Sequence, residues 1–123
     1  MREDPLKTRL RILGEARQLP LDNGRTLDVG RLANVLRLVA DRIEWKNWLR
    51  SVNGLVIACW HIDGAYVAHA IETAMQGEQL TITRVVCAVD VGRVINPLGL
   101  QGQVAGATLD ALSTALNPAI TFK

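Results

Sequence analysis

The sequence predicts an α+β fold: two N-terminal helices, a three-stranded antiparallel meander, and a C-terminal helix packed on the sheet. Apolar residues recur every three or four positions from Val29 to Ile43, which is typical of a helix with one buried face. Asp63-Gly64 separates two strand-like runs, as a tight hairpin turn does. We expect one domain over residues 1–123, with a helical half at 1–50, the meander at 54–91 and the last helix at 96–116.

The first helix is predicted to open at Asp4-Pro5, an N-cap followed by a proline that suits the first helical position. Residues 18–24 are expected to form a loop, because Asn23-Gly24 is a strong turn signal. The second helix is expected to begin near Thr26 or Asp28, and Trp45 and Trp48 are expected to close its end. Its apolar seam consists of Val29, Leu32, Leu36, Val39 and Ile43.

Three strands are predicted over residues 55–62, 65–75 and 80–91. A two-residue type I′ turn at Asp63-Gly64 fixes the register of the first two strands. That register pairs Ile62 with Ala65, His61 with Tyr66, Cys59 with Ala68, and Ala58 with His69. From Val85 up to Asp90 both alternating sets of residues are apolar, which predicts a strand covered on both faces.

The last helix is predicted to start at Asn96, a favoured N-cap, with Pro97 at its first position. Gly99, Gly102 and Gly106 fall on one side of this helix, and Gln103 lies beside them. Each glycine costs about 1 kcal/mol relative to alanine in a helix interior, so something is expected to approach the backbone closely. The residues alone leave two candidates open, another chain segment or a ligand, and a helix N-terminus with four unpaired N–H groups would favour an anion.

Composition excludes several classes of function. The net charge of +2 is too small to indicate nucleic-acid binding, although residues 1–50 carry 11 Lys and Arg against 7 Asp and Glu. These charges are expected to form the solvated faces of amphipathic helices. No apolar run is long enough to span a membrane and no secretory signal is present, so we expect a cytoplasmic protein. Cys59 and Cys87 lack metal or redox spacing and are expected to be free thiols.

Catalytic and metal-binding patterns are weak. The predicted register puts His61 and His69 on opposite faces of the hairpin, so no joint metal site is expected. Glu72 and Asp90 lie in one meander and are the candidates for paired carboxylates. We favour structural roles for both: a solvated or ion-paired acid for Glu72, and a hydrogen bond or an arginine partner for Asp90.

The segment from Val85 to Gly106 carries a resemblance to a known family. It reads Val-Val-Cys-Ala-Val-Asp-x-Gly-Arg-Val-x-Asn-Pro, with Gln-Val-x-Gly beginning seven residues after the asparagine. This resembles the molybdopterin-binding subunit of the xanthine dehydrogenase/aldehyde oxidase family, and most closely the isoquinoline 1-oxidoreductase β-subunit type. The stretch from Gly64 to Glu72 is similar to a second segment of that type. The resemblance is good from about Gly54 to Phe122 and weak from Asp4 to Trp45.

The resemblance implies a molybdopterin cofactor, with Gln103 against its pterin and Asn96, Gly102 and Gly106 in the same wall. Enzymes of the family oxidise aldehydes or N-heterocycles, and this implies two partners: the remaining polypeptide of the subunit and an iron–sulfur subunit. Ala105 replaces the family's usual glutamate, and the catalytic glutamate segment of the family lies downstream of Lys123. We therefore expect a fragment that is inactive alone. The alternative is a non-enzymatic domain that binds a small planar ligand or self-associates.

Overall fold

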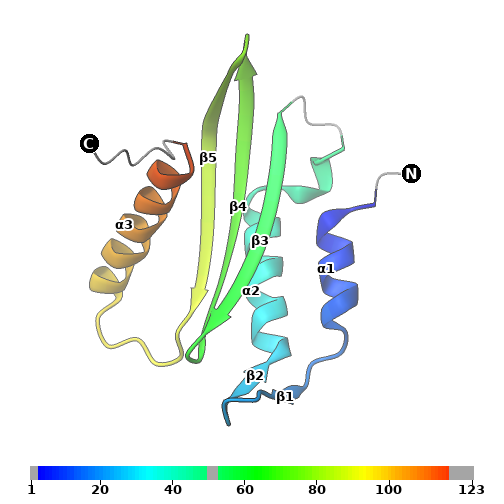
Figure 1. Cartoon of the computed structure of the whole chain (residues 1–123), viewed down its shortest axis with the longest axis vertical. Coiled ribbons are helices and arrows are strands. Elements are labelled where there is room, and N and C mark those ends of the chain that lie inside the picture. Colours follow the sequence, from blue (N-terminus) through cyan, green and yellow to red (C-terminus); the bar gives the residue numbers. More distant parts are fainter. Residues whose placement is uncertain (1–2, 50–52, 117–123) are drawn as a thin grey trace, which may run out of the picture. The chain divides into compact units, whose positions relative to one another are not determined.

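The computed structural model describes residues 3–49 and 53–116, which form two compact units that divide after Gly92. The organisation of residues 1–123 as a single domain stays a prediction. The first unit contains two α-helices, a short 3-10 helix and five strands (Figure 1). Their bounds are α1 Pro5–Leu13, β1 Gln18–Pro20, β2 Thr26–Asp28, α2 Val29–Arg42, η1 Trp45–Asn47, β3 Gly54–Ile62, β4 Ala65–Gln76 and β5 Gln79–Asp90.

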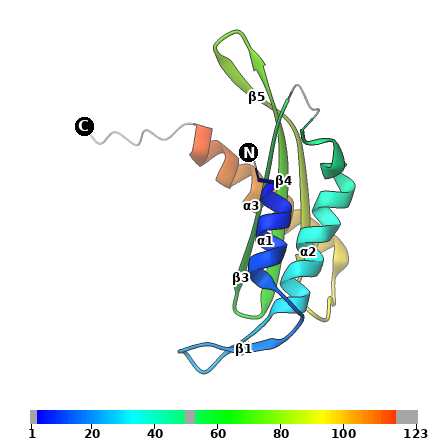
Figure 2. The ribbon, with the colours of Figure 1, turned by 90° about the vertical axis from the view of Figure 1, so that its right-hand side faces the viewer.

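Helix α2 provides the centre of the core. It lies across one face of the sheet, and α1 packs beside it on the side of β3 (Figures 1 and 2). The whole predicted seam of α2 is buried, with Leu36 and Val39 completely inaccessible to solvent. Opposite it, Ile57, Tyr66, Ala68 and Ala70 are the buried residues of the sheet. The side chains of Ala68 and Ala70 are small and buried, which leaves room for α2 to pack closely on the central strand.

Asp4 links the start of α1 to the end of α2. Its Oδ1 caps α1 by accepting a hydrogen bond from the Leu6 amide at 2.8 Å, as predicted. The same atom accepts the indole N–H of buried Trp45 at 2.9 Å. Trp45 and Trp48 stack with ring centroids 5.9 Å apart, so both close the end of α2 as expected. Leu6, Leu10 and Leu13 pack against the core from α1.

Strands β3, β4 and β5 form the predicted antiparallel meander. The observed register contains all four predicted pairs, from Ile62 with Ala65 to Ala58 with His69. Asp63 and Gly64 both have positive φ, 50° and 80°, which is the type I′ conformation. A tight turn that only one hydrogen-bonding register can follow thus made this pairing predictable.

A β-bulge interrupts β5 where Glu72 pairs with Arg84 and the next residue, Thr73, pairs with Ile82. The extra residue is Thr83, whose hydroxyl donates to the carbonyl oxygen of Glu72 at 3.2 Å. Because a bulge adds one residue to one strand only, the alternation of faces along β5 changes at this point.

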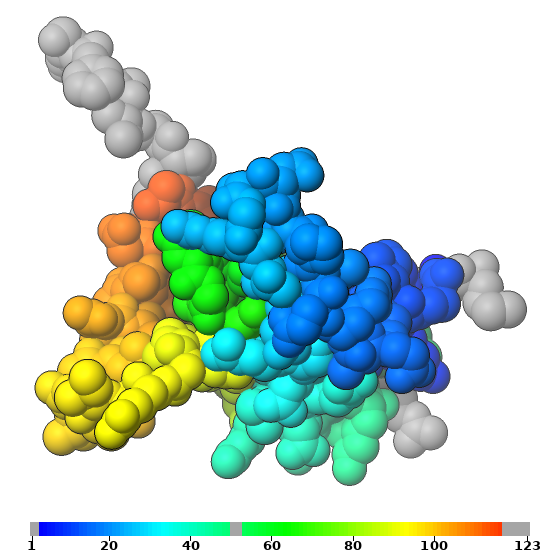
Figure 3. Space-filling view, turned by 90° about the horizontal axis from the view of Figure 1, so that it is seen from below, coloured from blue at the N-terminus to red at the C-terminus, as the bar shows by residue number. Residues whose placement is uncertain are grey.

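The expectation of a loop over residues 18–24 was wrong in part, whereas the expected start of a helix near Asp28 is confirmed. β1 and β2 pair as a short antiparallel hairpin at the end where α2 begins (Figure 1), which is the end that faces the viewer in Figure 3. Asp28 is the N-cap of α2, accepting the Arg31 amide at 3.0 Å, so the helix starts at Val29. Two strands of three residues each leave too short a pattern for the sequence to indicate.

Within the first unit only one face of β5 is covered, and the expectation that both of its faces are covered stays a prediction. None of its described residues is fully buried, because β5 is an edge strand and α2 covers only one face of the sheet. We call the face turned away from α2 the outer face, since cross-strand partners share a face. It is formed by Val56, Ala58, Trp60 and Ile62 of β3, Ala65, Val67, His69, Ile71, Thr73 and Met75 of β4, and Leu80, Ile82, Val85, Cys87 and Val89 of β5.

The second unit contains α3, Pro97–Leu116, with the predicted start at Asn96-Pro97. None of its described residues is fully buried. The α+β class, the two N-terminal helices, the meander and the C-terminal helix are therefore confirmed, whereas the packing of α3 on the sheet stays a prediction. In the described part of the chain, no helix combines the length with the hydrophobicity needed to cross a bilayer.

Candidate functional site

Three of the four residues predicted to bind a cofactor lie in helix α3, and the fourth, Asn96, directly precedes it. Gly102, Gly106 and Gln103 lie within one flank of α3, because positions three, four and seven apart share a side of a helix. We call this the glycine flank, and all three residues are exposed. The partly buried residues of α3 lie on the opposite side: Leu100, Val104, Thr108 and Leu112.

Asn96 has a defined structural role at the start of α3. Its side-chain oxygen accepts the Gly99 amide at 3.1 Å, and its carbonyl oxygen accepts the Leu100 amide at 3.1 Å. A methyl group on Gly99 would lie 2.9 Å from the Asn96 side-chain nitrogen and 3.1 Å from Cγ. The capping side chain would then have to move, so the helix cap itself explains why residue 99 is a glycine.

Gly102 and Gly106 have no such explanation inside their own unit. A methyl group built on either residue meets no described atom of residues 93–116 within 4 Å. Each glycine still costs helix stability. Of the three glycines, these two therefore remain the candidates for close approach by something outside α3.

The expectation of four unpaired N–H groups at this helix start was wrong. Pro97 has no N–H, and the Gly99 amide already donates to Asn96. At most two donors of the first turn remain, and that turn contains no charged side chain. The helix start is therefore a weaker anion site than predicted, and the glycine flank with Gln103 is the better place for a ligand.

Asp90 ends β5 in an ion pair that sequence reasoning did not locate. The Arg31 guanidinium donates from Nε to Oδ2 at 2.8 Å and from Nη2 to Oδ1 at 2.6 Å. Oδ1 also accepts the Gly92 amide at 3.0 Å. The Arg31 hydrogen bonds hold the pKa of Asp90 down at about 2, against desolvation, and Asp90 in turn raises the pKa of Arg31. The predicted structural role of Asp90 is confirmed.

The other titratable candidates do not assemble into a catalytic site. Glu72 accepts the Asn53 amide group at 2.9 Å, and its partner in the register is Arg84. Six positions along β4 separate Glu72 from the residue paired with Asp90, or about 20 Å at the usual rise of a strand. The two carboxylates therefore cannot act on one substrate atom.

The histidines and cysteines occupy different faces and surroundings. His61 contacts Tyr66 on the α2 side, with ring centroids 5.2 Å apart, whereas His69 lies on the outer face opposite Cys87. Burial lowers the pKa of His69 and raises the pKa of the thiols of Cys59 and Cys87. Among residues 3–49 and 53–116, no cluster of three His, Cys, Asp or Glu side chains is arranged to hold a metal ion.

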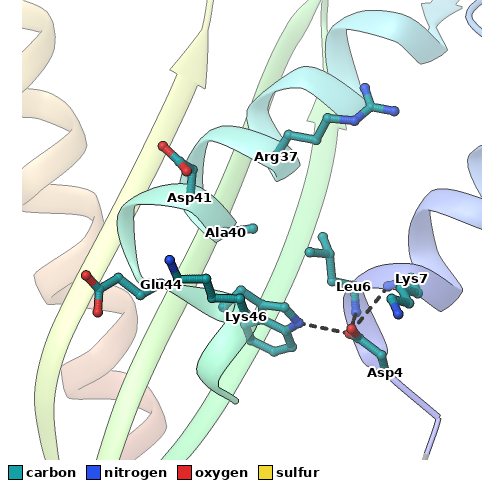
Figure 4. Close-up of a pocket in the computed structure, with 9 residues that line it drawn as sticks. Asp4, Leu6, Lys7, Arg37, Ala40, Asp41, Glu44 and Lys46 are labelled. Atoms are coloured by element: carbon teal, nitrogen blue, oxygen red, sulfur yellow. Dashed lines mark hydrogen bonds between the residues drawn. The ribbon is translucent and has the colours of Figure 1, made fainter. Parts of the chain in front are cut away.

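A groove of about 630 Å³ lies between the start of α1 and the end of α2 (Figure 4). Trp45 and Leu6 contribute apolar surface. The charged side chains that line it are balanced in sign: Lys7, Arg37 and Lys46 against Asp4, Asp41 and Glu44. This balance favours neither an anionic nor a cationic ligand, and the carboxylate of Asp4 is already engaged by three donors.

The family model of the molybdopterin cofactor-binding domain matches residues 57–123, which is more than half of the chain. The chain therefore belongs to the molybdopterin cofactor-binding domain family. It is similar to isoquinoline 1-oxidoreductase subunit beta of Brevundimonas diminuta, with 35% identity over 91 residues. The alignment covers 70% of this chain but only 12% of that relative. No solved structure matches the chain.

The described residues of α3 fit such a cofactor. The glycine flank leaves space beside the backbone at Gly102 and Gly106, where an added methyl group would meet no described atom of residues 93–116 within 4 Å. Gln103 stands beside them, and its exposed amide can both donate to and accept from a heterocycle.

Proposed function

We propose that this chain contributes one wall of a molybdopterin site in an oxidoreductase of the molybdenum hydroxylase type, acting on aldehydes or N-heterocycles. Family membership over residues 57–123, which include all of α3, is the observation that carries the proposal. Gln103 would hold the pterin by its amide, while Gly102 and Gly106 would let the ring system approach the helix. Asn96 would set where the helix begins by capping it.

The role of the chain in this proposal is binding and orientation. When bound, the molybdenum cofactor supplies the oxidation chemistry, and the protein positions it from several sides. The chain spans 12% of the length of the curated relative, so the other sides would come from further polypeptide of the subunit, with an iron–sulfur subunit as electron partner. The chain alone is expected to be inactive.

Gln103→Ala tests this proposal. We expect at least a fivefold loss of bound pterin, because a hydrogen bond to the ligand is worth about 1 kcal/mol. Unfolding should change by less than about 0.5 kcal/mol, because Gln103 is exposed. The chain would be produced with the polypeptides of the neighbouring reading frames in a host that makes the cofactor. Pterin fluorescence after oxidation and molybdenum content would be measured.

Gln101→Ala is the matched control, since Gln101 is also exposed but lies about 160° around the helix from Gln103. Equal losses from both variants would show that the effect is not specific to the glycine flank. Unfolding caused by Gln103→Ala would make Gln103 a structural residue and remove it from the site.

The outer face of the sheet exposes large apolar residues, which indicates that a polypeptide partner covers it. Trp60 and Ile62 are 69% and 60% exposed, although residues of this size are usually covered. An outer face of three strands with nine residues along each has an area of about 400 Å². This is roughly half of the surface that one partner buries in a standard interface. We propose that further polypeptide of the same subunit covers this face, because self-association through it alone would be weak.

Trp60→Arg is expected to weaken binding of that polypeptide about tenfold or more, since exposed aromatic anchors often dominate interfaces. The folding of the chain should be unchanged. Ile12→Arg is the control, because Ile12 is 72% exposed on α1 and lies off the outer face. Titration with the purified neighbouring polypeptide and sedimentation of the chain alone would decide. Tight dimers that Trp60→Arg dissociates would identify a second copy as the occupant, and equal effects of both variants would exclude the outer face.

A further inference from the structure

The chain leaves β5 through a short turn whose conformation depends on one carboxylate. Gly92 has φ 76°, a backbone conformation that side chains rarely adopt, and its amide donates to Asp90 Oδ1 at 3.0 Å. Every residue of the candidate cofactor segment follows this turn in the sequence. The direction in which the backbone passes residues 90–92 is thus set where the first unit ends.

Arg31 immobilises that carboxylate. Its planar fork makes two hydrogen bonds to Asp90, and one of them ends on the oxygen that also accepts the Gly92 amide. The Arg31 side chain also covers the turn, because its Nη2 lies 3.8 Å from where a Gly92 Cβ would be.

Arg31 is itself held from two sides. Its Cζ lies 4.5 Å from the centroid of the Tyr66 ring, which is buried. Its backbone amide donates to the Asp28 cap of α2, and the Asp28 amide donates to the Tyr66 hydroxyl at 2.9 Å. A continuous set of contacts therefore runs from the core through the start of α2 to the turn at Gly92.

We infer that Arg31 is a positioning residue, which fixes the Asp90 carboxylate and through it the Asp90–Gly92 turn, from which the chain continues into the segment that carries the candidate cofactor-binding residues. Stabilisation of the fold is the competing role. It is expected to be small, because the two side chains are 35% and 31% exposed. The consequence for cofactor binding rests on the proposed function, whereas the consequence for the turn does not.

Arg31→Lys tests the inference in the full chain, because lysine keeps the charge and loses the two-point fork. We expect the Gly92 amide to exchange with solvent at least about fivefold faster, measured by NMR. Pterin retention, measured on the co-produced complex, should fall several-fold while the unfolding midpoint stays nearly constant. Arg84→Lys is the matched control. Arg84 lies in β5 and donates to the carbonyl oxygen of Arg42, away from the turn at Gly92.

A charge swap separates positioning from simple ion pairing. Arg31→Asp combined with Asp90→Arg restores opposite charges but leaves no acceptor for the Gly92 amide. Asp90→Asn does the reverse, keeping the acceptor and removing the negative charge. We expect the Gly92 amide to exchange fast in the charge swap and more slowly in Asp90→Asn. Pterin retention should accordingly be lower in the charge swap than in Asp90→Asn.

The inference is overturned if Arg31→Lys leaves Gly92 exchange unchanged, or if the charge swap restores both slow exchange and pterin retention. Failure of the proposed function looks different: Gln103→Ala and Arg31→Lys would both leave pterin unaffected, while Arg31→Lys would still accelerate exchange at Gly92. That outcome supports Arg31 as the residue that positions the turn and rejects the cofactor wall.

Discussion

Replacing Gly102 and Gly106 together with alanine is expected to stabilise α3 and, at the same time, to abolish most cofactor binding. Alanine gains about 1 kcal/mol over glycine at each helical position. No described atom of the second unit lies close enough to oppose the added methyl groups. A ligand seated against the backbone would meet both of them, at a cost of about 1–3 kcal/mol each. Tenfold or greater loss of pterin is therefore expected.

Circular dichroism of the full chain and amide exchange within α3 would measure the gain in helix stability, and pterin fluorescence of the co-produced complex would measure retention. Gly99→Ala provides the contrast, because there the methyl group disturbs the Asn96 cap and should weaken the helix. If the double variant binds the cofactor as well as the native chain does, the glycines serve no ligand. The proposed site requires that the double variant increase the stability of α3 and decrease the retention of pterin.

Tyr66→Ala is expected to lower the free energy of unfolding by about 4 kcal/mol, the largest effect of a single substitution that we predict. Tyr66 is 2% exposed and is the largest fully buried side chain of the described residues. Its ring lies between α2 and β4, against Arg31 and His61. Its removal would leave a cavity where the helix meets the central strand.

Tyr66→Phe separates the ring from the hydroxyl. It should cost about 1–2 kcal/mol, because the Asp28 amide then loses its acceptor beside the α2 cap. Urea denaturation would measure both variants. Val67→Ala, at the neighbouring position on the partly exposed outer face, is the control and should cost less than Tyr66→Ala. A cost below about 1 kcal/mol for Tyr66→Ala would mean that the core of the first unit is not organised around this residue.

Much of the fold was predictable because its signals are local. The seam of α2 repeats with the helical period, and the Asp63-Gly64 turn permits one register, so both were correct to the residue. The pairing of Arg31 with Asp90 was not predictable, because 59 residues separate the partners and no periodicity links them. The β1–β2 hairpin is too short to leave a pattern.

The glycines of α3 show the same limit at the candidate site. In the sequence, Gly99, Gly102 and Gly106 are equivalent members of one spacing. Only atomic positions separate Gly99, which makes room for the capping Asn96, from the two glycines that α3 itself leaves unexplained. The assignment of Gln103, Gly102, Gly106 and Asn96 to a cofactor stays a prediction.

The bulge at Thr83 determines which residues of β5 share a face of the sheet. Leu80 and Ile82 precede it at even positions, and Val85, Cys87 and Val89 follow it at odd positions, yet all five share the outer face. If Thr83 instead entered the ladder without a bulge, it would pair with Thr73 and Ile82 would pair with Ala74, so Leu80 and Ile82 would turn toward the α2 side. The bulge thus keeps the apolar residues of both halves of β5 on one face, and the extent of that apolar face depends on the irregularity at Thr83 as well as on which residues are apolar.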